Sequence, residues 1–210
     1  MKAAVYDVEG APGVLKYVDV PDPVAGPDEI LISVEAISIE GGDLINRRST
    51  PPPLPSWIVG YAAAGTVVAV GSKVRNRRVG DRVTAFSMQG SHAERWAVPE
   101  ERNWLIPDGV DMAEAAAVPI SFATAHHCLF TRGMLRNGET VLIQAAAGGV
   151  GLAAVQLASQ AGATVIAVAS GTERISSLHE LGADYVVDRA KNNVVGSVRQ
   201  YTHGTGIDFV

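Results

Sequence analysis

The chain has 210 residues, of which 47% are hydrophobic and 19% are charged, and its formal net charge is −5. This composition is sufficient for a packed core and excludes a disordered chain. The negative net charge, with no basic cluster beyond residues 75–78, argues against nucleic acid as a main partner.

Cysteine use and apolar runs restrict the cellular setting. Cys128 is the only cysteine, so no intrachain disulfide can form and cysteine-rich zinc sites are excluded. The absence of disulfides favours a reducing cytoplasm. Asp7 and Glu9 interrupt the N-terminal apolar run, and no uncharged apolar stretch approaches ~18 residues. We therefore expect neither a signal peptide nor a membrane span.

The first half of the chain predicts a β domain. Short segments rich in Val, Ile, Thr and aromatic residues are separated by Gly, Pro, Asp and Asn. The predicted strands are residues 2–6, 14–20, 29–38, 65–71, 81–86 and 93–99. Their spacing favours a compact β-barrel or sandwich, which we assign to a first domain over residues 1–118.

The second half predicts alternating strands and helices. An Ala-rich helix begins near residue 112, with Asp111 as its N-cap. Predicted strands then follow at 140–145, 164–170, 185–188 and 207–210, and predicted helices at 150–162, 173–182 and 192–204. This alternation indicates an α/β fold with a doubly wound parallel sheet. We assign it to a second domain over residues 119–210, which ends inside its fourth strand.

A glycine-rich loop connects the first of these strands to a helix. The stretch "QAAAGGVGLAAVQLA" fits the template G-x-G-x-x-G, with Ala146 in the first glycine position. Gly148 allows a pyrophosphate to approach the backbone, and Gly151 allows the helix to pack closely on the strand. The helix N-terminus adds free N–H groups and a partial positive charge. The strand–loop–helix setting favours a dinucleotide site over a turn without ligand. The predicted binding residues are Ala146, Ala147, Gly148, Gly149, Val150 and Gly151.

The end of the next strand distinguishes the two nicotinamide dinucleotides. NAD binding calls for an Asp or Glu about 20 residues beyond the loop, to accept from the ribose 2′-hydroxyl. This chain has Ser170, Gly171 and Thr172 there, and Arg174 follows shortly after. Hydroxyls and a guanidinium bind a 2′-phosphate, so the segment predicts NADP(H). The alternative for Arg174 is an exposed helix cation.

Several motifs together resemble a known family. They are "EILISVEAIS", "GTVVAVGSKV", "VGDRVTAF", "AEAAAVPISFATAHHCL", "ETVLIQAAAGGVG" and "LGADYVVD". The chain resembles the medium-chain dehydrogenase/reductases, in the zinc-free quinone oxidoreductase branch typified by zeta-crystallin. The resemblance implies a GroES-like β-barrel domain followed by a Rossmann sheet, NADP(H) as cofactor, and a homodimer. Relatives are longer, so we expect this chain to be part of a longer product, with a naturally short form as the alternative.

The resemblance also implies a reaction without zinc. Zinc-dependent relatives carry their metal ligands where this chain has Glu40, Tyr61, Ala62 and Ile120. We therefore expect no metal site. A zinc-free reductase needs an acceptor that takes hydride without strong Lewis-acid help, and quinones and α,β-unsaturated carbonyls satisfy this requirement.

The implied catalytic residues match the family pattern only in part. Asp43 matches it, and the residue equivalent to Thr124 contacts the nicotinamide in the family. Glu40 stands where quinone reductases usually have Asn, and Tyr61 could supply a phenol. The alternatives are a hydrogen-bonded loop carboxylate for Glu40, core packing for Tyr61 and an ordinary helix threonine for Thr124. Two other functions therefore stay open: a non-catalytic NADPH-binding protein and an enoyl-thioester reductase.

Overall fold

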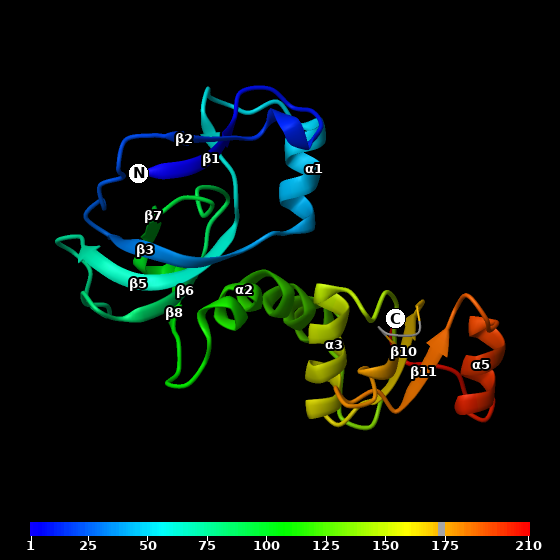
Figure 1. Cartoon of the computed structure of the whole chain (residues 1–210). Coiled ribbons are helices and arrows are strands. Elements are labelled where there is room, and N and C mark those ends of the chain that lie inside the picture. Colours follow the sequence, from blue (N-terminus) through cyan, green and yellow to red (C-terminus); the bar gives the residue numbers. More distant parts are fainter. Residues whose placement is uncertain (172–174) are drawn as a thin grey trace. The chain divides into compact units, whose positions relative to one another are not determined.

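The computed structural model describes residues 1–171 and 175–210. It contains two compact units, Met1–Ile120 and Ser121–Val210, and helix α2 (Met112–His126) includes the boundary between them (Figure 1). Each unit has its own sheets and its own core.

The first unit is built from antiparallel strands. A five-stranded sheet has the order β7-β3-β5-β6-β8, and a three-stranded sheet has the order β2-β1-β4. An antiparallel bridge between Ala3 and Ala93 links β1 to the chain before β7. The strands are β1 (Lys2–Tyr6), β2 (Lys16–Asp19), β3 (Glu29–Ser38), β4 (Trp57–Ile58), β5 (Ala62–Val70), β6 (Arg82–Phe86), β7 (Arg95–Pro99) and β8 (Asn103–Leu105).

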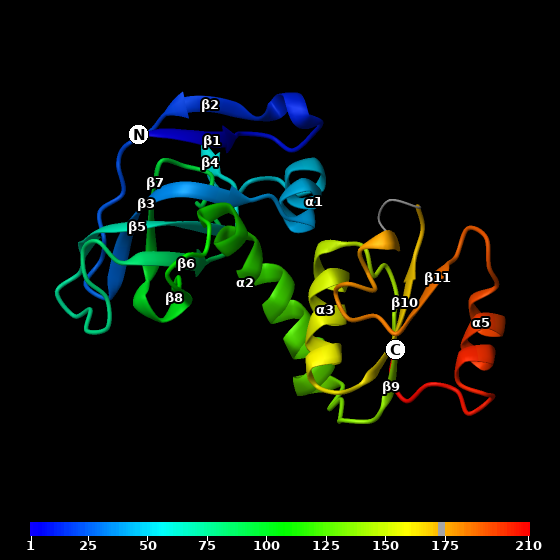
Figure 2. The ribbon, with the colours of Figure 1, turned by 60° about the horizontal axis from the view of Figure 1, so that its bottom comes forward.

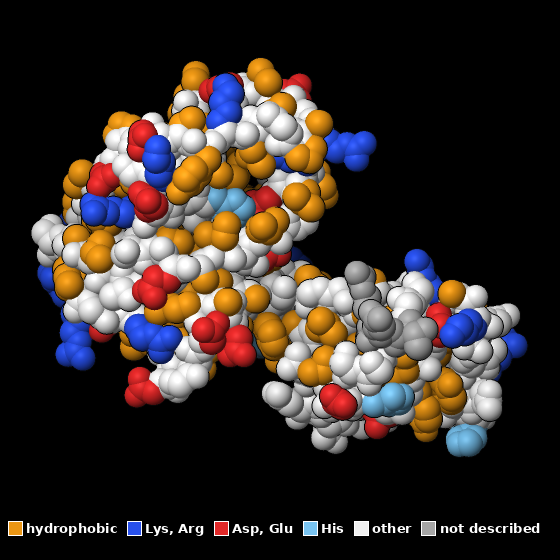
Figure 3. Space-filling view, in the orientation of Figure 1, with side chains coloured by type: hydrophobic (Ala, Val, Ile, Leu, Met, Phe, Trp, Pro, Cys, Tyr) orange, Lys and Arg blue, Asp and Glu red, His pale blue; other side chains and the backbone are white. Residues whose placement is uncertain are grey.

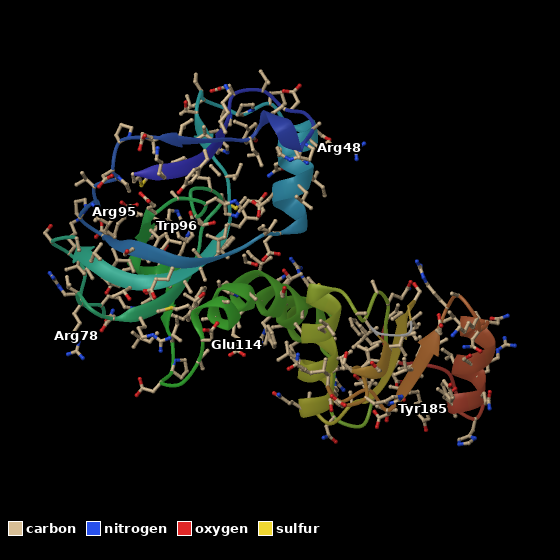
Figure 4. All side chains as sticks on the ribbon, viewed as in Figure 1. Arg48, Arg78, Arg95, Trp96, Glu114 and Tyr185 are labelled. Carbon is tan, nitrogen blue, oxygen red and sulfur yellow. The ribbon has the colours of Figure 1, made fainter. Side chains whose placement is uncertain are left out.

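Alternating side chains of these strands form the core of the first unit. On β7, Trp96 is buried and its indole N–H donates to the carbonyl of Gln89 at 2.9 Å. Its neighbour Arg95 faces the opposite way and pairs with Asp22, as period-two alternation requires (Figure 4). The other buried members of the cluster around Trp96 are Ile30, Ile32, Ala63, Val67, Val74, Val83, Ala85 and Val98.

Helix α1 (Gly41–Ser49) interrupts the β structure of the first unit. The pattern of residues 1–118 predicts strands and loops only, and the two glycines that open this segment disfavour a helix. Tertiary contacts explain the helix. Arg47 is buried and donates from its guanidinium to the carbonyl of Gly10, and the Gly10 amide donates to the Arg47 carbonyl at 2.8 Å.

The second unit contains a parallel sheet with helices on both faces. Its strands β9 (Thr140–Ile143), β10 (Thr164–Ala169) and β11 (Tyr185–Asp188) have the order β11-β10-β9. Helices α3 (Gly149–Gln160) and α5 (Val194–Tyr201) cover opposite faces (Figure 2).

The core of the second unit follows this layering. Val141, Val165 and Ala167 pack in the cluster that includes α3, and Ile166 and Val168 pack in the one that includes Val198 of α5. The structure thus confirms the α/β fold class with a doubly wound parallel sheet.

Two elements of the second unit differ from their predictions. Part of the helix predicted over 173–182 lies outside the described residues. Of the rest, only 175 and 176 are helical, and the Leu178 amide donates to the Ile175 carbonyl at 3.2 Å in a tighter turn. Ser176 and Ser177 lie between Ile175 and Leu178. Because serine side chains compete with helical hydrogen bonding, these two residues explain the difference. At the predicted fourth strand, Phe209 forms an isolated parallel bridge with Val141.

Candidate functional site

The glycine-rich loop turns sharply as it leaves β9. Ala145 has a φ of +51°, in the left-handed region, and the Ala146 amide donates to the Val168 carbonyl at 3.0 Å. The Gly148 amide closes the turn by donating to the Ala145 carbonyl at 2.9 Å. The first helical bond then runs from the Leu152 amide to the Gly148 carbonyl. The three N–H groups between them, on residues 149–151, therefore open α3 without intrahelical acceptors.

Both key glycines are explained by their surroundings. A Cβ on Gly151 would lie 2.3 Å from the Ala145 oxygen and 2.7 Å from the Ala146 Cα, so only glycine allows α3 to pack this closely. Among the described residues, a Cβ on Gly148 would meet only the Ala145 oxygen, at 3.3 Å, and no other atom of these residues lies within 4 Å of it. The loop thus has the close packing and the open backbone that a phosphate cradle requires.

A pocket of about 240 Å³ lies beside this loop, where β9, β10 and β11 end. The carboxyl ends of parallel strands are where open α/β sheets bind ligands. The lining residues are Ala145, Ala147, Gly148, Val168, Ala169, Ser170 and Arg189.

Arg189 is a site residue that the sequence analysis did not identify. Its amide donates to the Ala169 carbonyl at 3.0 Å, and its guanidinium Nε donates to the Ser170 hydroxyl at 3.4 Å. A signal was present, because Arg189 directly follows the predicted third strand and the ends of parallel strands share one sheet edge. The predicted cofactor residues Thr172 and Arg174 lie outside the described residues, and Gly171 makes a left-handed turn at a φ of +98°.

The first unit holds a second polar group at the start of α1. The Glu40 amide donates to Asp43 Oδ2 at 2.8 Å, and the Ser38 hydroxyl donates to Glu40 Oε1 at 2.6 Å. Asp43 is only 7% exposed. The two predicted catalytic carboxylates thus share one turn, and a hydrogen bond holds each of them.

Tyr61 packs directly against this turn. A Cβ on Gly42 would lie 2.5 Å from the Tyr61 ring, and Asn46 Nδ2 donates to the phenol oxygen. Burial raises the pKa of the Tyr61 phenol, the negative charge of Asp43 raises it further, and the hydrogen bond from Asn46 opposes them. The phenol therefore keeps its proton at neutral pH, and its O–H remains a donor.

The structure adds further polar residues to this group. His92 Nε2 lies 3.2 Å from the Ser38 carbonyl oxygen and 4.0 Å from Asp43 Oδ2. The sequence analysis did not identify Asn46, Ser38 or His92, since no motif marks them. Glu40, Asp43 and Tyr61 are brought together in the first unit, whereas Thr124 lies exposed on α2 in the second.

The described residues show neither a metal-ligand cluster nor a membrane-spanning helix. Within residues 1–171 and 175–210, no three His, Cys, Asp or Glu side chains gather as a metal site. No helix in this part of the chain is both long and apolar enough to cross a bilayer. Figure 3 shows basic and acidic side chains interspersed over the visible face of the first unit.

Two protein families match the chain. The alcohol dehydrogenase GroES-like domain matches residues 26–108, and the zinc-binding dehydrogenase family matches residues 149–210. Together the two matches cover more than half of the chain.

Three relatives agree with these matches. A Pseudomonas aeruginosa quinone oxidoreductase is 38% identical over 198 residues, covering 93% of this chain and 61% of its own length. The chloroplastic NADPH-dependent alkenal/one oxidoreductase of Arabidopsis thaliana is 36% identical, covering 92% of this chain and 54% of its own length. The Escherichia coli quinone oxidoreductase complexed with NADPH superposes with a TM-score of 0.90 at 28% identity, over 99% of this chain and 64% of that one. The chain spans less than two thirds of the length of each, and it belongs to the medium-chain dehydrogenase/reductase superfamily, in the quinone oxidoreductase branch.

Proposed function

We propose that the chain carries an NADPH-dependent reductase activity toward quinones or α,β-unsaturated carbonyls. The pocket where the glycine loop, Ser170 and Arg189 meet carries this proposal. The relatives support it, because they include a quinone oxidoreductase, an alkenal/one oxidoreductase and a quinone oxidoreductase complexed with NADPH.

The residues present fit this cofactor. The open side of Gly148 and the free N–H groups of residues 149–151 suit a pyrophosphate. We propose that Ser170 and Arg189 hold the 2′-phosphate, together with Thr172 and Arg174. The guanidinium and hydroxyl donors favour NADPH over NADH, because a dianionic phosphate gains from both. When bound, NADPH supplies the hydride.

The polar group of the first unit suits the delivery of the proton. Hydride addition to an enone places negative charge on its oxygen, and a proton donor is needed to neutralise this charge. We propose that Tyr61 donates this proton and that Asn46 orients its hydroxyl. Burial and the negative charge of Asp43 both raise the pKa of the phenol, and Glu40 is a second candidate donor. Thr124 is proposed to contact the nicotinamide.

We propose that this chemistry is zinc-independent. The positions of the metal ligands in zinc-dependent relatives hold Glu40, Tyr61, Ala62 and Ile120 here. Alanine and isoleucine offer no donor atoms, and the Tyr61 hydroxyl is already bonded to Asn46. Residues 1–118 would then bind the substrate and residues 119–210 the cofactor, in a homodimer.

A cofactor-consumption screen tests the proposal. Mass-verified protein is mixed with NADPH or NADH and with quinones, enals and enoyl thioesters, and the loss of absorbance at the nicotinamide band is followed. We expect oxidation of NADPH in preference to NADH by quinones or enals. Calorimetric binding of NADPH without turnover on any acceptor would instead support a non-catalytic binding protein. Turnover confined to thioesters would support an enoyl-thioester reductase.

A further inference from the structure

We propose that His92 is a positioning residue: its Nε2–H donates to the Ser38 carbonyl and thereby fixes the acidic turn that begins α1. Its catalytic consequence rests on the function proposed above. The hydrogen bond itself can be tested without turnover.

The backbone of His92 is held between two neighbouring segments. Its amide donates to the Val59 carbonyl at 3.0 Å, and its carbonyl accepts from the Ala4 amide at 2.9 Å. Gly60 lies against the ring at a φ of +104°, and a Cβ there would lie 2.3 Å from His92 Cδ2. Backbone and ring are therefore constrained together, and the imidazole is directed at the end of β3.

The protonation of the ring nitrogen follows from its acceptor. A carbonyl oxygen can only accept, so the 3.2 Å contact with Ser38 requires a proton on Nε2. The same nitrogen lies 4.0 Å from Asp43 Oδ2, and both side chains are nearly buried, at 10% and 6% exposed. The N–H that binds the carbonyl thus also has a carboxylate oxygen nearby. The other ionisable groups at this turn are Glu40 and Tyr61.

Ser38 connects this bond to the proposed catalytic group. It is the last residue of β3, and its hydroxyl holds Glu40 while its carbonyl accepts from His92. Two residues later the Glu40 amide binds Asp43, so the His92 bond fixes the point where α1 begins. Asn46 stands on the same helix and binds the Tyr61 phenol. A shift of this turn would misplace both carboxylates and the phenol's partner.

Two substitutions separate hydrogen bonding from packing. His92→Gln keeps an amide donor of similar reach, and His92→Phe keeps an aromatic ring without any donor. Amide hydrogen exchange at residues 40 and 43, measured by NMR, reports the turn directly. We expect exchange about tenfold faster in H92F, the size of one lost hydrogen bond in a local opening equilibrium, and little changed in H92Q.

Turnover gives a second readout. In the function proposed above, H92F should lower kcat about tenfold and leave the NADPH Kd unchanged, and H92Q should restore most of kcat. His179→Phe is the matched control, because His179 Nδ1 also contacts a backbone carbonyl, that of Ala183, at 2.9 Å in the second unit. H179F should leave exchange at residues 40 and 43 unchanged.

The possible outcomes are distinct. The inference would be overturned if the amides of residues 40 and 43 exchanged at the same rate in H92F as in the unaltered chain. It would also be overturned if H92Q exchanged as fast as H92F. If H92F does not fold, the 15N chemical shifts of the His92 ring in the unaltered chain show which ring nitrogen carries the proton. A neutral ring protonated on Nδ1 would overturn the inference. An unaltered chain that turns over no acceptor would refute the proposed function, while the exchange data would still test the hydrogen bond.

Discussion

Replacement of Arg189 by Ala tests how the chain selects its cofactor. Arg189 stands at the edge of the pocket, bonded to the Ser170 hydroxyl at 3.4 Å, and both residues are exposed. A hydrogen bond to a charged group contributes about 1.5–3 kcal/mol, and solvent screening at an exposed position favours the lower end. A loss of about 1.5 kcal/mol corresponds to roughly a tenfold weaker Kd.

The effect should depend on the 2′-phosphate. We expect R189A to weaken NADPH binding about tenfold and to leave NADH binding nearly unchanged, because NADH carries no 2′-phosphate. Isothermal titration calorimetry of both cofactors at fixed salt measures the ratio. R199A is the matched control, since Arg199 is an exposed arginine on α5 of the same unit and does not line the pocket.

One result would refute this reasoning. An unchanged ratio of NADPH to NADH affinity in R189A would show that the guanidinium does not meet the 2′-phosphate. R174A, measured in parallel, would then show whether Arg174 provides the selectivity instead.

The remaining predictions concern chemistry and stability. Y61F should lower kcat on enones about a hundredfold with the NADPH Kd unchanged, and undiminished turnover would exclude the phenol as donor. G151A should lower the free energy of unfolding in urea by about 1–3 kcal/mol, because its Cβ would lie 2.3 Å from the Ala145 oxygen. G13A should cost little, because no atom of the residues that the structure describes lies within 4 Å of its Cβ. The Ser91 hydroxyl is buried without a hydrogen-bond partner among the described residues, so S91A should be neutral or stabilising by up to about 1 kcal/mol, and a clear loss would contradict this. Since the folded-state pKa of Tyr61 is raised, its contribution to stability is complete below about pH 10 and is lost as the pH rises further. The midpoint of urea unfolding should therefore fall less between about pH 8 and 11 in Y61F than in the unaltered chain.

The second unit was largely predictable because its signals are local. Continuous apolar runs predicted the buried strands β9 and β10, and the spacing of the glycines predicted the loop and the start of α3. The close contact of Gly151 with Ala145 follows from the same spacing. Arg189 directly follows the predicted third strand, but its place beside the loop depends on the order of the strands in the sheet, and it was therefore missed.

The first unit was harder to predict, because its polar group is assembled from distant segments. Asp43 lies on α1, Tyr61 directly precedes β5 and His92 lies in the chain before β7, and long-range packing places them together. Helix α1 is held by the buried Arg47 contact with Gly10 in addition to the local bond between Glu40 and Asp43, and local helix propensity cannot reveal the Arg47 contact. The resemblance pointed to Asp43 and Tyr61, but nothing in it indicated their partners Asn46 and His92.

The conformation of Ala145 has a consequence for engineering this chain. A left-handed alanine costs about 1–2 kcal/mol relative to its usual conformations, and glycine would avoid that cost. The left-handed conformation directs the Ala145 carbonyl toward the Gly148 amide, and Ala145 also borders the pocket. A search for more stable variants would therefore select glycine here. The added backbone freedom would loosen the pocket wall, so thermostability and ligand affinity would be optimised by opposite changes at one position.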